Sequence, residues 1–133
     1  MPVAERAARA HDTAVSMLET AAQKQRLSGM LIALAERKDE LDATYTALEG
    51  ELEAAVATPD PSAPTVTSDT KAAEFAKQVQ ANAKAEMEKA RIIERTTVKM
   101  EQVGLAKDEV DARMKELLDE LRALEQRGTG DIQ

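Results

Sequence analysis

Apolar residues recur along this chain at alternating spacings of three and four, which places them on one face of a helix. In the first half, the stripe consists of Leu27, Leu31, Leu34, Leu41, Leu48 and Leu52, with Lys38 and Tyr45 among them. In the second half, a single register contains Phe75, Val79, Ile93, Met100, Val103, Val110, Met114, Leu117, Leu121 and Leu124. Stripes sustained over so many heptads predict coiled-coil packing between two long helices, and we call the predicted contact the seam.

A second apolar series lies upstream of Leu27. Its members are Val3, Ala7, Ala10, Ala14, Met17 and Ala21. The step from Ala21 to Leu27 is one residue shorter than a heptad, which predicts local overwinding or a kink.

A proline-rich segment separates the two halves. Residues 58–70 read TPDPSAPTVTSDT and contain Pro59, Pro61 and Pro64, which end helices and favour a loop. We therefore expect a single helical domain, 1–133. It comprises a first arm at 3–57, a linker at 58–70, a second arm at 70–127 and a tail at 128–133 that begins at a helix-ending glycine.

The predicted fold is all-α, a long antiparallel helical hairpin. If the arms fold back about the middle of the linker, Leu52 lies level with Phe75 and Leu27 with Met100. Residues 36–53 contain seven acids and two bases, whereas residues 71–99 contain seven bases and four acids. We expect these two stretches to face each other, so that the basic repeat Lys77, Lys84 and Arg91 matches the acidic arm rather than an anionic partner.

A four-helix bundle is the alternative architecture. Gly29 and Gly104 interrupt the two arms, and β-branched residues cluster at 92–98, which weakens the helix locally. In the predicted register Gly29 lies level with Val98, which suggests a hinge or a close contact at that height.

Composition excludes several kinds of chemistry. The 133 residues contain no Cys and no Trp, one His, one Phe and one Tyr, and carry a net charge of −7. Without Cys there is no disulfide, thiolate zinc site or thiol nucleophile. So few aromatic residues are unlike a typical ligand pocket, and the acidic balance argues against nucleic acid as a partner.

No constellation of residues indicates catalysis or metal binding. His11 has only Ala and Val at three and four residues' distance on a helix, and the acidic clusters lack the spacing of a calcium loop. We expect no catalytic residues, no cofactor and no metal, and hence a protein that is not an enzyme.

The expected function is that of a structural or assembly protein that self-associates or docks in a larger particle, such as a phage virion component or scaffold. The alternative is a helical chaperone or adaptor that binds a client helix. In either case a homo-oligomer or protein partner would contact apolar residues off the seam, namely Leu18, Ile32, Ile92, Leu105 and Leu118.

The sequence also bears on location. The longest apolar run, Met30–Ala35, is too short for a membrane span, and no signal peptide is evident. We therefore expect a chain that does not enter membranes and stays in the cytoplasm or in an intracellularly assembled particle.

Overall fold

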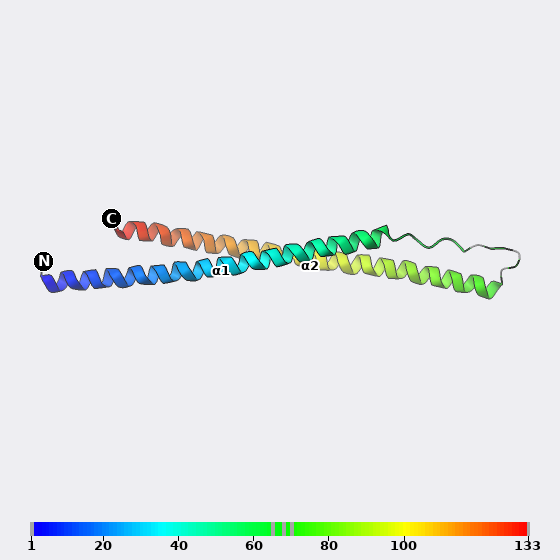
Figure 1. Cartoon of the computed structure of the whole chain (residues 1–133), viewed down its shortest axis with the longest axis horizontal. Helices are drawn as coiled ribbons and strands as arrows, with labels where there is room; N and C mark the ends of the chain where they lie inside the picture. Colours follow the sequence, from blue (N-terminus) through cyan, green and yellow to red (C-terminus); the bar gives the residue numbers. More distant parts are fainter. Residues whose placement is uncertain (1, 65, 68, 70, 133) are drawn as a thin grey trace. The chain divides into compact units, whose positions relative to one another are not determined.

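The protein is an all-α helical hairpin made of two long helices, α1 (Val3–Ala57) and α2 (Ala72–Ile132) (Figure 1). The computed structural model describes every residue except 1, 65, 68, 70 and 133, and describes 128–132 by their backbone alone. The described residues contain no strand.

Both helix ends at the linker have local causes. At the end of α1, the Thr58 amide donates to the carbonyls of Ala54 and Ala55, and the Thr58 hydroxyl also donates to Ala54. Pro59 follows and has no amide hydrogen to continue the ladder. At the start of α2, the Phe75 amide donates to the Lys71 carbonyl at 3.1 Å, so Lys71 precedes the first turn.

The glycines do not interrupt either helix, so the four-helix alternative is wrong. Gly29 lies within α1 and Gly104 within α2, and a Cβ atom added at either position would meet nothing within 4 Å. The expected close contact at Gly29 is therefore absent. The helical backbone of α2 also continues to Ile132, past the end predicted at Gly128, while Thr70 of the predicted second arm lies outside the described residues.

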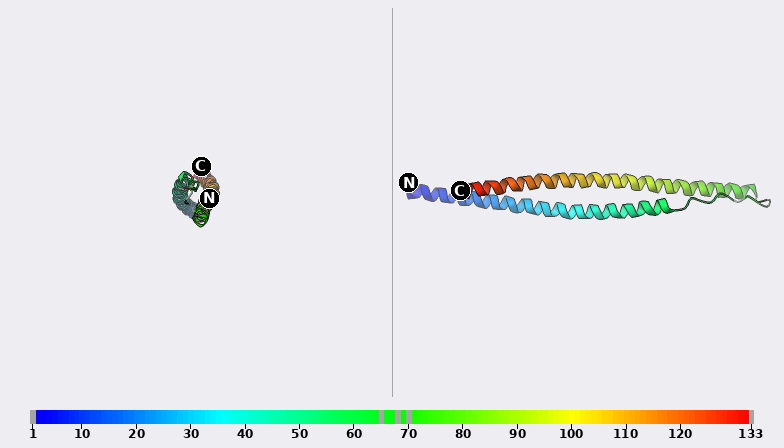
Figure 2. Two further views of the ribbon diagram at one scale, coloured as in Figure 1. Left: turned by 90° about the vertical axis from the view of Figure 1, so that its right-hand side faces the viewer. Right: turned by 90° about the horizontal axis from the view of Figure 1, so that it is seen from above.

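The chain forms two compact units, each built from both helices. Unit 1 contains residues 1–40 and 107–133, and unit 2 contains residues 41–106. Within each unit a part of α1 lies beside a part of α2 (Figure 2).

Unit 1 is held by a leucine cluster. Its buried members are Leu27 on α1 and Leu117 and Leu124 on α2, with Leu31, Leu34 and Leu121 packed against them. Leu117 is completely buried. The Lys38 ammonium lies 2.8 Å from the Asp111 carboxylate beside this seam, and both side chains are partly exposed.

Unit 2 has a thinner core and a linker that lies along α2. Leu41, Leu48 and Ala55 are buried on α1, and Thr96 is buried on α2. The Lys89 ammonium donates to the Thr58 carbonyl at 2.7 Å, and the Asn82 amide donates to the Ser62 carbonyl at 2.8 Å. The end of α1 therefore lies level with Lys89, and the linker runs beside the part of α2 that precedes it.

The predicted faces of the helices are correct, but the predicted register is wrong. Leu27 clusters with Leu117 and Leu124 rather than with Met100. The predicted register also places Lys38 level with Lys89, whereas Lys38 meets Asp111 in the structure. The displacement is about three heptads along α2, which leaves the same stripes in contact. The observed register brings Leu against Leu in unit 1, where the predicted one would have placed Leu117 beside Ala10.

This register leaves both ends of the predicted seam outside the packed region. Phe75 and Val79 are 38% and 44% exposed. All described residues of α1 before Thr20 are exposed, including the upstream series from Val3 to Met17. The packed stripe of α1 instead extends back from Leu27 through the partly buried Lys24 and Thr20 in heptad spacing, and no helix break marks the predicted kink.

Replacing Gly29 or Gly104 with Ala should stabilise the protein by about 1 kcal/mol per site, because each sits inside a helix with open space for a methyl group. Urea unfolding followed by circular dichroism measures this. Ala112→Gly, at an exposed helix position, is the reverse control and should destabilise by a similar amount. A loss of stability in either alanine variant would contradict the open space beside that glycine.

Leu117→Ala should lower the free energy of unfolding by about 3 kcal/mol, because it removes a fully buried side chain from the leucine cluster. The neighbouring Leu118, which is 41% exposed, provides the matched control. Leu118→Ala should cost about 1 kcal/mol or less in the same urea titration, and equal losses at the two positions would contradict the observed packing.

Candidate functional site

The most extensive candidate site is the set of apolar side chains that the seam does not cover. The five predicted partner contacts, Leu18, Ile32, Ile92, Leu105 and Leu118, are all among the exposed large apolar residues. Leu18 and Ile32 are 70% and 61% exposed and lie two heptads apart, so they share one line along α1 in unit 1. Whether these residues contact a partner remains a prediction.

The predicted seam residues divide into a packed and an unpacked group. Those at least partly buried on α1 are Leu27, Leu31, Leu34, Leu41, Leu48 and Leu52. Those at least partly buried on α2 are Ile93, Met100, Val103, Val110, Met114, Leu117, Leu121 and Leu124. Only Phe75 and Val79 of the predicted set are exposed, and they precede the part of α2 that lies beside α1.

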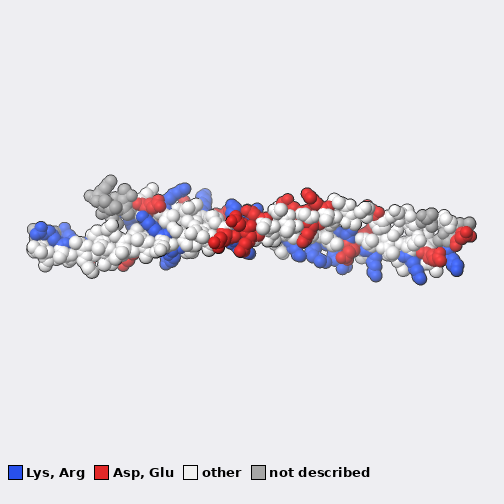
Figure 3. Space-filling view, viewed as in Figure 1, with Lys and Arg blue, Asp and Glu red and all other residues white. Residues whose placement is uncertain are grey.

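Charge is unevenly distributed in unit 2. Its segment of α1 carries Glu49, Glu51 and Glu53 and no base. The outer side of α2 carries a heptad repeat of bases, Lys77, Lys84 and Arg91. Figure 3 shows basic side chains along one edge of this unit, toward the right of the view, and acidic ones mainly on the opposite edge.

The expected match between these bases and the acidic stretch 36–53 is therefore not made. Lys77 and Lys84 precede Lys89, which already lies level with the end of α1. Among the described residues, Arg91 forms its ion pair with Glu88 of its own helix, at 3.9 Å. The displaced register is the reason, because it places 36–53 beside a later part of α2.

The sequence analysis missed the residues that hold the linker and adjoin the seam. Lys89 also approaches the Asp60 carboxylate at 3.3 Å, so it binds two linker residues, and Asn82 binds a third. Asp111 pairs with Lys38. The sequence shows that these polar residues lie within or beside an apolar stripe. It does not show which residues they bind, because that depends on the register between the two helices.

His11 lies beside a carboxylate on the exposed surface of α1. Its Nδ1 atom lies 3.6 Å from the Asp12 carboxylate, and both side chains are largely exposed to solvent. In the part of the chain that the structure describes, no group of three His, Cys, Asp or Glu residues could hold a metal ion. The other ion pairs within α1 and α2, such as Arg37 with Glu40 and Arg113 with Glu116, are exposed pairs along one helix that contribute little to stability.

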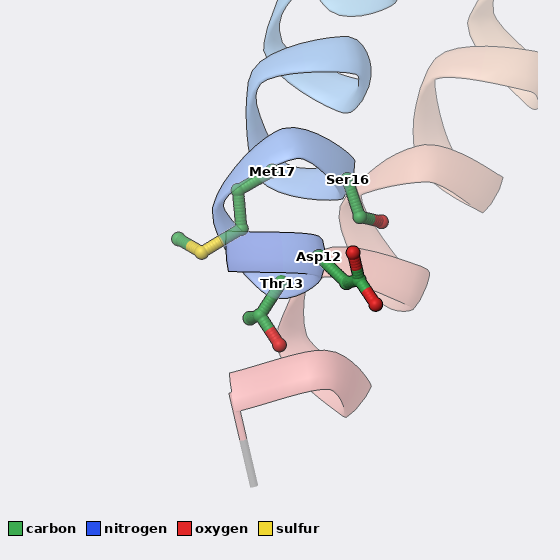
Figure 4. Close-up of a pocket in the computed structure, with 4 residues that line it drawn as sticks. All are labelled: Asp12, Thr13, Ser16 and Met17. Carbon is green, nitrogen blue, oxygen red and sulfur yellow. The ribbon is translucent and has the colours of Figure 1, made fainter. Parts of the chain in front are cut away.

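The hollows of unit 1 include the following pair, both shallow. Asp12, Thr13, Ser16 and Met17 of α1 line the first, and Figure 4 shows Asp12 and Ser16 on one side of the helix and Met17 on the other. The second lies between the helices and is lined by Gln23, Arg26, Leu27, Glu120, Ala123, Leu124 and Arg127. The first hollow contains hydroxyl groups beside the Asp12 carboxylate but no described His or Lys, and the second contains no described hydroxyl residue, so the exposed apolar stripes are the stronger candidates for a functional surface.

Over the described residues, neither helix contains a stretch long and apolar enough to span a membrane. Comparisons with protein-family models, with curated proteins and with solved structures find no match. Any function proposed for this surface therefore rests on the chemistry of the surface residues themselves.

A cysteine pair can test the register that defines this surface. The double variant Lys38→Cys/Asp111→Cys should be joined within one chain by a short bis-maleimide, because the native side chains meet at 2.8 Å. The variant Lys38→Cys/Lys89→Cys represents the rejected register and should remain unjoined. The chain contains no other thiol. Intramolecular joining of the second pair and not of the first would overturn the observed register.

Proposed function

We propose that this protein is a non-enzymatic structural or assembly component that works through helix-mediated association with further copies of itself in a larger particle. The observation that carries the proposal is the imbalance between a narrow packed seam and abundant exposed apolar surface. Only six apolar residues are buried among those described, while large apolar side chains along both helices remain exposed.

The energetic argument follows from the geometry of two helices. Each helix can bury one stripe against the other, and the buried stripe contains Ala55 and Thr96 in unit 2 besides its leucines. Burial of one leucine contributes roughly 2 kcal/mol, so a seam with so few buried leucines supplies only part of the free energy that ordering two long helices requires. Association that covers Leu18, Ile32, Ile92, Leu105 and Leu118 would add apolar burial and stabilise the fold by mass action.

A client-binding adaptor is the second candidate function. The same exposed line on α1, Leu18 and Ile32, could receive an amphipathic helix of another protein. The two functions differ in whether the chain itself forms oligomers, and this difference is measurable.

Size-exclusion chromatography with light scattering should give a mass that is a multiple of the 14.4 kDa chain. Ile32→Asp should lower that mass, because it places a charge in the apolar line that we propose to be covered. Ala33→Asp is the matched control, since it adds the same charge at an exposed position about 100° around the helix from Ile32, off this line, and removes no large apolar side chain.

A monomeric native chain at every concentration would contradict self-association. An oligomer whose mass is unaffected by Ile32→Asp, combined with loss of a bound partner helix in that variant, would favour the adaptor function instead.

A further inference from the structure

Two exposed lines of side chains, one on each helix, are complementary to each other. The first, which we call the α1 line, lies in unit 1 and contains Gln25, Ile32 and Asp39 at heptad spacing. Ile32 is about 100° around α1 from the packed Leu31 and about 160° from the packed Leu34, so the line faces away from the seam. All three side chains of the α1 line are exposed.

The second line, which we call the α2 line, lies in unit 2 and contains Arg91, Val98 and Leu105, again at heptad spacing. Val98 is two residues from Thr96 and two from Met100, which both pack in the seam. Two residues correspond to about 200° around a helix, so the α2 line is on the side opposite the seam. Val98 and Leu105 are 45% and 65% exposed, and the Arg91 side chain is also largely exposed.

The linker is bonded to a different side of α2. Its bonds are to Asn82 and Lys89, which lie at heptad spacing with the buried Thr96 and therefore on the seam side. These bonds leave the α2 line accessible to another helix.

The two lines do not meet within one chain. Lys38, which precedes Asp39, pairs with Asp111, twenty residues after Arg91 on α2. Both lines also face away from the seam that joins the two helices. Complementary lines that are separated within one chain can meet only between chains.

We propose that the α1 line of one copy packs antiparallel against the α2 line of a second copy. The occupant is a second copy because this chain carries both of the lines that match. Three pairs then come level, namely Ile32 with Val98, Asp39 with Arg91, and Gln25 with Leu105. This register sets an apolar side chain opposite an apolar side chain and an acid opposite a base.

The residues that flank the two lines fit the same register. Glu36 comes beside Arg95, which adds a second pair of opposite charges. The acids of α2 in this stretch come beside small neutral residues of α1, Glu94 beside Ala35 and Glu101 beside Ser28. Over this contact, therefore, no acid of one copy meets an acid of the other.

Registers displaced by one heptad lack this match. A displacement in one direction sets Asp39 opposite Val98, and a displacement in the other sets Ile32 opposite Arg91. Each places a charged group against an apolar side chain, which selects against those registers.

The contact joins two different surfaces, one from unit 1 of a copy and one from unit 2 of the next copy. Such heterologous contacts repeat from copy to copy and produce open chains or closed rings rather than an isologous dimer. This inference rests on the proposed self-association and specifies which surfaces carry it.

Charge reversal tests the contact. Asp39→Arg and Arg91→Asp should each lower the oligomer mass measured by light scattering, because each variant sets like charges opposite each other. Mixing the two variant chains should restore the mass, because every contact between unlike variants again pairs an acid with a base. Glu51→Arg is the matched control, since it reverses the same charge at an exposed position about 120° around α1 from Asp39, and should leave the mass unchanged.

Cysteine pairs test the register. Ile32→Cys/Val98→Cys, treated with a short bis-maleimide, should give a ladder of linked species at multiples of 14.4 kDa on a denaturing gel. The control Ile32→Cys/Ala112→Cys places the second thiol two heptads further along α2 at the same angular position and should give no ladder. Ile32→Cys alone should remain unlinked, and a linked dimer of that single variant would show α1 packed against α1 and overturn the proposal.

The outcomes separate this interface from the proposed function. An oligomer that keeps its mass in both charge-reversal variants would refute the interface and leave self-association standing. Loss of mass in both variants without recovery on mixing, when circular dichroism shows unchanged helix content, would refute the pairing of Asp39 with Arg91. A native chain that is monomeric at every concentration would refute both the interface and the function.

Discussion

The structure depends on one interaction, the packing of a single apolar stripe on α1 against a single apolar stripe on α2. Leu27, Leu117 and Leu124 form its densest part. No disulfide, metal cluster or second layer supports it within the described residues. The positions of the linker bonds, the Lys38–Asp111 pair and the exposed surfaces all follow from which part of one stripe meets which part of the other.

The periodicity of the sequence predicts the stripes well and the register poorly, for the same physical reason. A heptad pattern specifies the face that each helix buries, and the stripe from Leu27 to Leu52 is packed as predicted. Sliding one helix by whole heptads preserves that pattern, so periodicity alone cannot distinguish registers that differ by whole heptads. Folding the arms back about the middle of the linker, which also sets 36–53 opposite 71–99, predicts a register that would place Leu117 beside Ala10, and the structure does not adopt it. Pairs of exposed charges contribute little to stability in water, whereas buried leucine pairs contribute more. The leucine contacts therefore determine the register between the two helices.

The surface shows a similar division between what local sequence determines and what it does not. Exposure of Leu18, Ile32 and Leu105 follows from their positions off the stripe. The linker contacts could not be predicted, because Lys89 and Asn82 bind backbone carbonyls of Thr58 and Ser62, which every residue type presents. The helix end predicted at Gly128 failed because a glycine weakens a helix by only about 1 kcal/mol, which an established helix can tolerate.

Because the linker is extended, the rotational position of side chains around the axis of one helix does not depend on the number of residues that join it to the other helix. In a tight turn, adding a residue would force one helix to move against the other. Here the linker lies along α2 and its course contains length that no stripe uses, so an insertion between Pro59 and Asp69 changes no side chain's position around either helix axis. One residue inserted inside α1 or α2 instead rotates every later side chain by about 100°, out of the stripe. Changes in length should therefore be tolerated in one short segment and excluded from the long helices on either side, where a single added residue is more disruptive than most substitutions.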